Sequence, residues 1–437
     1  MRTFVVMLVA TVLGALAWGT VVGMQPVPVR PPARTVEVGP AWYAALPVDP
    51  VAATNAYLQR VPPEIRARGD AFGATRYITL LLRIVVLVAA VALVMFSGAA
   101  ARMRAIAQRA SSRVWLQDAL VALQLFVVLF LFNLPVETYA GFIRLRNAGF
   151  SQRTFLDWLA EAALGWAVVA VFSTVGVVAI MALIRRRPQS WVVWATLVYL
   201  ALSSVYVLVS PIYIEPLFNR ITSLPNGPDK QAILSLAHAN GVPASDVFVR
   251  DASRQSALLN AHVSGIGGTA QIILDDNTIA NTPRPEFKLV MAHEIGHYVL
   301  AHIPKGIVFD ALVMAVGFLF IGWASRRLIG RFGHRWSVDS LADVGAVPVF
   351  WGFFLLWGFI SLPVTNTISR EDEAEADIFG INASREPYGL ADFMIRDADA
   401  TQLDPSPMEE WLFYSHPSAR NRIFVAMRWR AENLSDR

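Results

Sequence analysis

About seven long apolar segments constrain the fold of this 437-residue chain more than any other feature of its sequence. Each approaches the ~20 mostly apolar residues that a helix needs to cross the hydrocarbon core of a bilayer. Because that core offers no water to backbone N–H and C=O groups, such segments cross it as helices. We therefore predict a mainly α-helical, multi-pass protein embedded in the lipid bilayer. The segments comprise residues 3–23, 78–98, 115–134, 158–184, 191–210, 306–325 and 343–363.

The composition points to the same class of protein. Hydrophobic residues make up 55% of the chain and charged residues 16%, against about 25% charged residues in an average soluble domain. The chain has no cysteine, which excludes disulfides, thiolate metal ligands and a cysteine nucleophile. Its net charge of +4 comes largely from arginines in short loops. Without a continuous basic face or a nucleotide motif, we expect neither a nucleic acid nor a nucleotide as a partner.

The predicted spans divide the chain into four parts. Residues 1–213 hold the first five membrane helices with their loops, and residues 306–363 hold the last two. Between and after them lie two extramembrane parts, 214–305 and 364–437. The first span, 3–23, fits both a membrane anchor and a cleaved signal peptide, since a basic residue, an apolar stretch and a small-residue motif occur in both.

Three short loops between the predicted spans are rich in arginine, at residues 97–113, 185–188 and 325–335. The positive-inside rule places such loops in the cytoplasm. The extramembrane parts 214–305 and 364–437 would then lie together on the opposite side of the membrane.

Two ionisable residues lie inside predicted spans, which marks them as candidates for a functional role. Arg83 and Asp118 occur near opposite ends of consecutive spans, and consecutive spans run antiparallel. We therefore expect that they do not pair, and that Asn133 is the better partner for Arg83.

Part 214–305 mixes helical and strand patterns and is predicted to form a small α+β portion. A first helix covers residues 229–240. A second begins near Pro283 or Pro285, because proline suits the first helical turn, and runs to about Ile303. The predicted strands are residues 246–251, 256–265 and 270–276, with a turn at Gly265, Gly267 and Gly268.

The second helix carries the sequence His-Glu-x-x-His at 293–297 within an otherwise apolar run. At 3.6 residues per turn, His293 and His297 lie on one face and can bind one zinc ion. Glu294 lies beside the open metal position, where it can act as general base on the water that a catalytic zinc binds. A largely apolar helix would not bury three polar groups without a use. The pattern therefore predicts a zinc peptidase rather than a solvated helix face.

A catalytic zinc site has three protein ligands, so a third must follow downstream. The acidic segment 369–377 is the best candidate. Glu373 and Asp377 are four residues apart and share a helix face. One can bind zinc while the other accepts the spare N–H of a ligating histidine. We favour Glu373 as the ligand and expect Glu371 and Asp372 on the solvated face.

These motifs resemble those of the type I CAAX prenyl protease family, which are integral-membrane zinc endopeptidases of the gluzincin type. With the seven spans, the resemblance covers most of the chain. It implies helices that form a barrel-like chamber with zinc at one end, Glu373 as the third zinc ligand and Asp377 as the partner of a zinc-binding histidine. The matching blocks are His-Glu-x-x-His at 293–297, Ser369, Arg370, Glu373, Glu375, Ala376 and Asp377, the Asn-Ala block LLNAHVSGIGGTAQIILDD, and SHPSARNR at 415–422.

The resemblance also implies roles in binding and catalysis. Asn260 and Ala261 would lie on a strand that pairs with an extended substrate, which suits an exposed sheet edge. His262 follows them where the family usually has an aromatic residue, a difference that bears on substrate side-chain preference. His416 and Arg422 would approach the scissile carbonyl or steady the zinc-binding glutamate.

Three further histidines are not expected to bind the metal. His302 lies five residues past His297, off the zinc-binding face, and is predicted at the membrane interface. His238 and His334 are predicted as ordinary surface residues.

The sequence thus predicts a zinc metalloendopeptidase that hydrolyses peptide bonds of membrane-associated, prenylated or extended peptide substrates. It would lie in the plasma or inner membrane of a bacterium, or in the endoplasmic reticulum of a eukaryote. The eukaryotic family suggests a cytosolic catalytic face; the arginine-rich loops favour the other side, which we prefer. Two alternatives stay open: a membrane quality-control zinc protease with four spans, and a transporter or scaffold with a structural zinc site, which would need four protein ligands.

Overall fold

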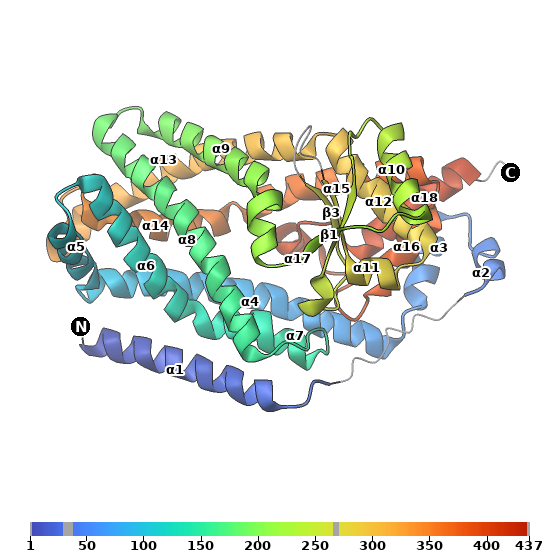
Figure 1. Ribbon diagram of the computed structural model, residues 1–437, viewed down its shortest axis with the longest axis horizontal. Coiled ribbons are helices and arrows are strands. Elements are labelled where there is room, and N and C mark those ends of the chain that lie inside the picture. The colour runs from blue at the N-terminus through green and yellow to red at the C-terminus, as the bar shows by residue number, and fades with distance from the viewer. Residues whose placement is uncertain (1, 29–37, 265–270, 435–437) are drawn as a thin grey trace.

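The computed structural model describes residues 2–28, 38–264 and 271–434 of the chain. Long helices run side by side along one axis, and a small sheet with shorter helices occupies one end of the molecule (Figure 1). The turn that the sequence predicts at Gly265, Gly267 and Gly268 lies outside the described residues.

Six helices of the described chain are long and apolar enough to cross a membrane, judged by length and composition. A seventh span exists if α14 (Val347–Ile360) and α15 (Leu362–Ser384) count as one, because together they pass the same criteria with a bend of 47°. Pro363 lies at the break, where its missing N–H favours interruption of a helix. The predicted count therefore agrees with the structure, but the last span is a broken helix. The six helices are α1 (Arg2–Met24), α4 (Pro63–Phe96), α6 (Val114–Glu137), α8 (Phe155–Arg186), α9 (Trp191–Val209) and α13 (His302–Trp336).

The ionisable side chains of the spans are paired. Arg83 of α4 binds Glu137 at the end of α6, with Nε 2.8 Å from Oε1. Asn133 donates to the same carboxylate at 2.7 Å, so the prediction that Asn133 is the partner of Arg83 is wrong. The carboxylate one turn further along α6 attracts the guanidinium more strongly than a neutral amide. Asp118 is fully buried and receives two hydrogen bonds from Arg185, at 2.6 and 2.7 Å; as expected, it does not pair with Arg83.

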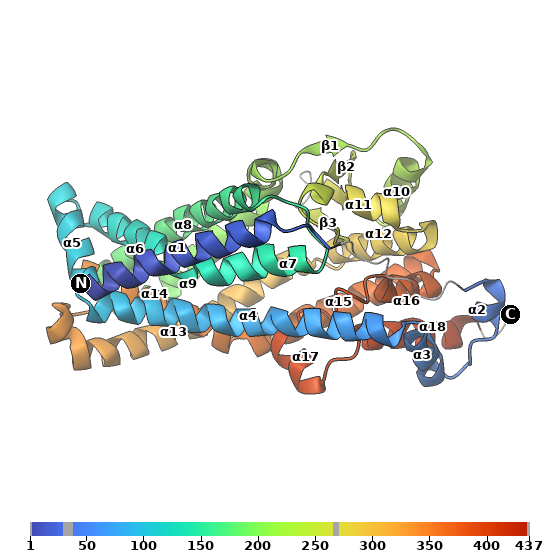
Figure 2. The ribbon, with the colours of Figure 1, turned by 90° about the horizontal axis from the view of Figure 1, so that it is seen from below.

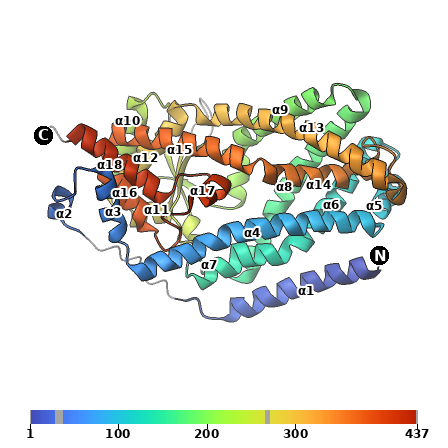
Figure 3. The ribbon, with the colours of Figure 1, turned by 180° about the vertical axis from the view of Figure 1, so that it is seen from behind.

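The arginine-rich loops and the sheet lie at opposite ends of the helical bundle. Figure 2 shows α5 (Ala99–Ala110) and the end of α13 at one end, and the sheet toward the other. The helix α3 (Pro50–Gln59) packs beside the C-terminal helix at the sheet end (Figure 3). Parts 214–305 and 364–437 therefore lie on the same side of the membrane spans. The remaining short helices of this region are α2 (Pro40–Ala44), the π-turn η1 (Thr138–Ile143), α7 (Arg144–Asn147) and the π-turn η2 (Ser210–Ile214).

The sheet has the strand order β1-β2-β4-β3, which leaves β3 at an edge. Strand β1 (Ile221–Ser223) is antiparallel to β2 (Val247–Arg250), which is parallel to β4 (Gln271–Asp275). Strand β3 (Ala261–Ser264) is antiparallel to β4. The edge position agrees with the sequence prediction, although β3 is shorter than the predicted 256–265. Two helices flank these strands, α10 (Pro228–Ala239) and α11 (Asp276–Asn281).

The helix with His-Glu-x-x-His ends earlier than its sequence predicts. Helix α12 spans Arg284–Val299, and Ala301 takes a left-handed conformation with φ of 58°. Left-handed backbone interrupts a right-handed helix, so the chain turns at Ala301 and α13 begins at His302. The prediction of one helix to about Ile303 is therefore wrong, and the turn changes the position of His302.

Close packing of α12 on α15 joins the two motifs. A Cβ atom added at Gly380 would lie 3.1 to 3.3 Å from the backbone and Cβ of His293, and one added at Gly296 would lie 3.0 Å from Phe379. Only glycine at these positions lets the two helices approach so closely. The C-terminal helices α16 (Pro387–Arg396), α17 (Pro407–Phe413) and α18 (Ala419–Leu434) pack around this pair.

We predict that Gly380→Ala destabilises the protein, because the new Cβ pushes against helix backbone that cannot rotate away. Overpacking of this kind costs about 1–3 kcal/mol, and the thermal midpoint should fall accordingly. Gly306→Ala in α13 is the matched control, since nothing lies within 4 Å of its Cβ position. It should leave the midpoint unchanged or raise it. Equal midpoints for the two variants would contradict the packing argument.

Candidate metal centre

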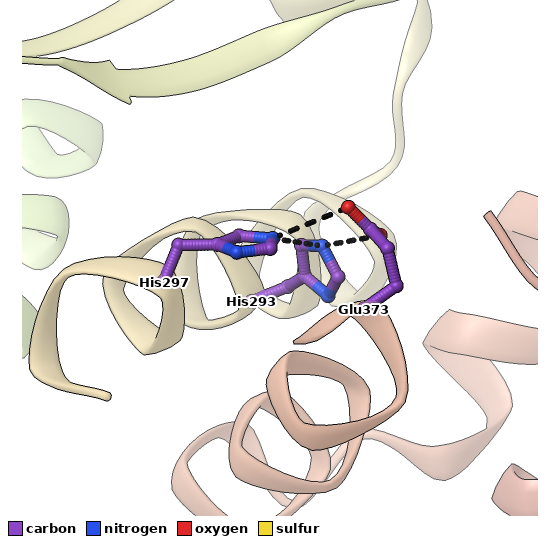
Figure 4. A group of neighbouring side chains, drawn as sticks. All are labelled: His293, His297 and Glu373. Carbon is purple, nitrogen blue, oxygen red and sulfur yellow. Dashed lines mark hydrogen bonds and ion pairs between the residues drawn. The ribbon is translucent and has the colours of Figure 1, made fainter. Parts of the chain in front are cut away.

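Three side chains from α12 and α15 converge at the buried contact between these helices. His293 and His297 stand one turn apart on α12, and Glu373 reaches them from α15 (Figure 4). The two Nε2 atoms are 3.2 Å apart. Glu373 places Oε2 3.3 Å from the Nε2 of His293 and Oε1 3.5 Å from that of His297. Among the described residues, this is the one group of three or more whose ligand atoms could hold a metal ion.

The spacing fits a bound metal. Metal–ligand bonds of about 2.0–2.1 Å in tetrahedral geometry, as zinc has with nitrogen and oxygen, place ligand atoms about 3.3 Å from each other. The two Nε2 atoms are 3.2 Å apart, close to that value, and each lies 3.3 or 3.5 Å from a different oxygen of the Glu373 carboxylate. The Oε2 atom of Glu373 is buried and has the ring of His293 as a partner at 3.3 Å, so the carboxylate and the imidazole are held together as ligands of one ion would be. The donor set therefore fits a metal cation.

A buried ion pair holds His293 from behind. Its Nδ1 atom lies 3.0 Å from Asp377, and Asp377 in turn receives two hydrogen bonds from Arg422 of α18, at 2.8 and 2.5 Å. Burial disfavours the charged ring, but hydrogen bonds to Asp377 and Glu373 outweigh it and raise the pKa of His293 to about 10. A metal cation at Nε2 would replace the proton that this pKa describes.

His302 holds the second histidine, a contact that sequence reasoning missed. Its Nδ1 atom lies 2.9 Å from Nδ1 of His297, and its Nε2 lies 3.3 Å from Glu375. His302 is buried within the protein and is the first residue of the candidate span His302–Trp336, so its placement at the membrane interface stays a prediction. The turn at Ala301 folds it back onto α12, whereas a continuous helix would have carried it away. Burial and the positive field of His293 lower the pKa of His297 to about 4, which keeps its ring neutral as a metal ligand requires.

Glu294 lies beside the three candidate ligands and lines the same cleft. Burial raises the pKa of its carboxyl group to about 7, with the charge of His293 opposing the rise. A carboxylate with a pKa near the working pH is well suited to take up and return a proton.

His416 reaches the cleft from the segment between α17 and α18. Its Nε2 atom lies 3.2 Å from Oε1 of Glu373, although 58% of its side chain remains exposed. Arg370 fixes this segment by donating to the backbone oxygens of Glu410 and Tyr414, at 2.9 and 2.5 Å. Arg370, which belongs to the acidic motif, thus holds the segment that carries His416.

A cavity of about 310 Å³ is lined by all the predicted site residues except Asp377. Asp377 lies on the far side of the His293 ring, next to its Nδ1 atom. Strand β3 forms one wall with Asn260, Ala261 and His262. His262 has Nε2 3.4 Å from Glu215 and is outside the metal-binding group. His238 and His334 are exposed, as predicted. The predicted site residues that line the cavity are Asn260, Ala261, His262, His293, Glu294, His297, Glu373, His416 and Arg422.

The free edge of β3 presents backbone groups to this cavity. Asp275 of β4 donates its N–H to the carbonyl oxygen of Asn260 at 3.2 Å, so the backbone groups of Asn260 face into the sheet. Successive residues of a strand point their backbone groups to alternate sides. The N–H and C=O of Ala261 therefore face the open edge, where an extended peptide can pair with them.

Helices long and apolar enough to cross a membrane, a group of three candidate metal ligands and a carboxyl group beside an open strand edge are features of a membrane metallopeptidase. Comparison with known proteins gives the same class. The family model for peptidase family M48 matches residues 224–430, and the model for the CAAX prenyl protease N-terminal region, with five membrane helices, matches residues 72–220. The chain belongs to this family of CAAX prenyl protease-type membrane metalloproteases.

Individual relatives span bacteria and eukaryotes. The chain is 29% identical to the uncharacterized metalloprotease YhfN of Bacillus subtilis, over 67% of this chain and 69% of that protein. It is 27% identical to CAAX prenyl protease 1 of Saccharomyces cerevisiae, over 67% of this chain and 68% of the yeast protein. The crystal structure of S. mikatae Ste24p has the same fold, with a TM-score of 0.69 at 18% identity, covering 97% of this chain and 99% of that one.

We predict that His302→Ala weakens metal binding about 10- to 100-fold, because loss of the partner of a ligating histidine costs that much. A competition titration with a chelator of known affinity measures the effect. His238→Ala is the control, since His238 is exposed, lies outside the metal-binding group and hydrogen-bonds to the backbone oxygen of Ala244. Unchanged affinity in His302→Ala would show that the His297–His302 contact does not orient the ligand.

Proposed function

We propose that this protein is a zinc metalloendopeptidase that cleaves extended peptide segments presented within or beside the membrane. The convergence of His293, His297 and Glu373 in the cleft under β3 carries the proposal, because one ligand atom from each lies within 4.8 Å of the others and two histidines with a carboxylate are a ligand set of catalytic zinc. His293, His297 and Glu373 bind the metal. Bound zinc polarises the substrate carbonyl and makes water a better nucleophile.

The protein's own residues orient the substrate and move the proton. The substrate pairs with the N–H and C=O of Ala261, which brings its scissile carbonyl over the metal centre. Glu294 takes the proton of the attacking water and then delivers it to the leaving amine. His416, exposed on the cleft, donates a hydrogen bond to the developing oxyanion.

Arg422 and Asp377 have a different part in the proposed mechanism. Arg422 uses two donors on Asp377 and is 4.0 Å from Glu373. This geometry supports a positioning function, in which Arg422 holds Asp377, and Asp377 holds the ring of His293. The resemblance implies that Arg422 either approaches the scissile carbonyl or steadies the metal site. We assign it the second role.

The substrates are membrane-associated peptides or proteins, with or without a prenyl group. Several eukaryotic relatives bear the name CAAX prenyl protease, which supports prenylated chains as one substrate class. The bacterial relative is described as a metalloprotease without reference to a prenyl group, so we do not restrict the proposal to prenylated chains. Placement in the plasma, inner or endoplasmic reticulum membrane depends on the host.

The two alternative functions are less well supported. A four-span protease disagrees with the six or seven candidate spans and with the match to a five-helix membrane region. A structural zinc site would need a fourth protein ligand, and the described residues group three. The adjacent Glu294 has no use in a structural site.

The metal assignment predicts a clear division among four variants. His293→Ala, His297→Ala and Glu373→Ala should each lose stoichiometric zinc, because each removes one of three ligands. Glu294→Gln should keep zinc and lose peptide hydrolysis by a factor of at least ~100, since only the proton acceptor is removed. Elemental analysis and hydrolysis of a quenched fluorescent peptide measure both. Full zinc in Glu373→Ala would assign the third ligand elsewhere.

The strand-pairing proposal predicts the effect of Ala261→Pro. Proline removes the N–H that faces the open edge, so peptide hydrolysis should fall while zinc content is retained. Ala261→Gly keeps the N–H and is the control, with hydrolysis expected closer to that of the unmodified protein. Equal loss in both variants would assign the effect to the side chain instead of the backbone donor.

A further inference from the structure

A second cavity, of about 580 Å³, lies inside the helical bundle next to the metal centre. Helix α4 contributes residues 72, 73, 76, 80 and 83, which fall on one face because they are three or four residues apart. The exposed apolar side chains Ile78, Leu82 and Val85 occupy the opposite face of α4. The cavity therefore lies on the side of α4 that faces away from these apolar, lipid-compatible residues.

The lining of this cavity carries more positive than negative charge. Three arginines, Arg76, Arg83 and Arg144, contribute to it, with Glu137 as the one carboxylate in the lining. Arg83 binds that carboxylate. Within the described part of the chain, neither Arg76 nor Arg144 forms an ion pair with a carboxylate. Arg76 is exposed and Arg144 is partly buried, and two guanidinium groups that line one cavity without carboxylate partners favour an anionic ligand.

Arg144 is held in a fixed orientation without an acidic partner. Its guanidinium carbon lies 4.1 Å from the ring centroid of Phe72, and it donates to the backbone oxygen of Phe72 and to the hydroxyl of Thr75, at 3.3 and 3.1 Å. Its Nε atom is buried with no hydrogen-bond partner. An oriented guanidinium with an unused donor is suited to bind an oxyanion such as a carboxylate.

The arginine-lined cavity adjoins the peptidase cleft through two stretches of chain. Leu258 and Ser415 line the arginine-lined cavity. Their chain neighbours Leu259 and His416 line the peptidase cleft. A peptide that pairs with the open edge of β3 is expected to run antiparallel to it, since antiparallel pairing is the more stable and the more frequent. Such a peptide passes Ala261 first and Leu258 afterwards, so its C-terminal side points toward Arg76 and Arg144.

We infer that Arg76 and Arg144 form a subsite for a carboxylate on the C-terminal side of the scissile bond. The carboxylate belongs either to an aspartate or glutamate side chain or to the free C-terminus of the peptide. This inference rests on the proposed peptidase function and adds a specificity determinant to it. The subsite selects substrates with negative charge at a set distance after the cleavage position.

Two series of quenched fluorescent peptides test the subsite and distinguish the two carboxylate sources. The first series is amidated at its C-terminus and places Asp, or Asn as the neutral match, at each of the first five positions after the scissile bond. The second series keeps Asn throughout, varies in length and ends in a free carboxylate or an amide. The purified protein in a neutral lipid should cleave the charged peptide with kcat/KM on the order of tenfold higher at one or two positions.

Variants of the two arginines should remove this preference. In Arg76→Gln and Arg144→Gln the ratio of kcat/KM for charged over neutral peptides should fall toward one, mainly through KM. Arg76→Lys should retain part of the ratio, because it keeps the charge but loses the planar fork. Arg187→Gln, at an exposed residue of the loop between α8 and α9, is the control and should keep the full ratio. Zinc content and the thermal midpoint verify that each variant is folded.

Three results would overturn the inference. A ratio unaffected in folded Arg76→Gln and Arg144→Gln, or a ratio of one in the unmodified protein, removes the carboxylate subsite while leaving the peptidase proposal in place. If phosphatidylglycerol vesicles suppress cleavage of charged peptides by the unmodified protein but not by the variants, a lipid phosphate occupies the cavity instead. If the zinc-loaded protein cleaves none of the peptides, the peptidase proposal itself fails, and the subsite with it.

Discussion

The metal centre depends on one close contact between two helices. A Cβ atom added at Gly380 would lie 3.1 Å from the backbone N of His293, and one added at Gly296 would lie 3.0 Å from the side chain of Phe379, so α12 and α15 pack closely at both glycines. At this separation, Glu373 reaches between His293 and His297. A larger residue at either glycine would separate a histidine pair that is fixed on one helix from a carboxylate that is fixed on another. The fold thus sets the ligand spacing through backbone contact rather than through flexible side chains, which keeps the donor atoms in position before any metal binds.

The two histidines are held from behind by different partners, and the sequence reveals one of them more readily than the other. Asp377 could be predicted, because a four-residue spacing from Glu373 and a helical pattern place it one turn away. Its anchor, Arg422, came from the motif near the end of the chain. The contact of His302 with His297 could not be predicted, since it depends on the left-handed conformation of Ala301. Pro304 and Gly306 signal a boundary near this point, but they place the end of the helix a few residues too late and do not reveal the direction of the turn.

The same distinction between local and tertiary information applies to the fold. Apolar segment length predicted the membrane helices, because the bilayer requires it. The break between α14 and α15, the three-residue strand β1 and the partnership of Arg83 with Glu137 were missed. The strand is too short to show a pattern, and the ion pair depends on a neighbour distant in sequence. The break has a local signal in Pro363, which a count of apolar residues does not use. The edge strand was found because alternation of apolar residues between turn signals survives in a single short segment, and its open side follows from the sheet order.

Paired and unpaired polar groups separate structural from ligand-binding positions in this protein. Asp118 with Arg185 and Glu137 with Arg83 are complete ion pairs, as buried charges require for stability. Glu373 and Arg144 each keep a buried polar atom without a good hydrogen bond, and the two residues line the two adjoining cavities along the proposed path of an antiparallel peptide across β3. Incomplete polar groups lower the stability of the protein without its ligands and gain partners when a cation or a carboxylate binds. Ligands that bind the folded state in this way stabilise it in proportion to the logarithm of their concentration above Kd. The metal, bound in the peptidase cleft, and a charged peptide, bound at the arginine-lined cavity, should therefore each raise the free energy of unfolding of the protein.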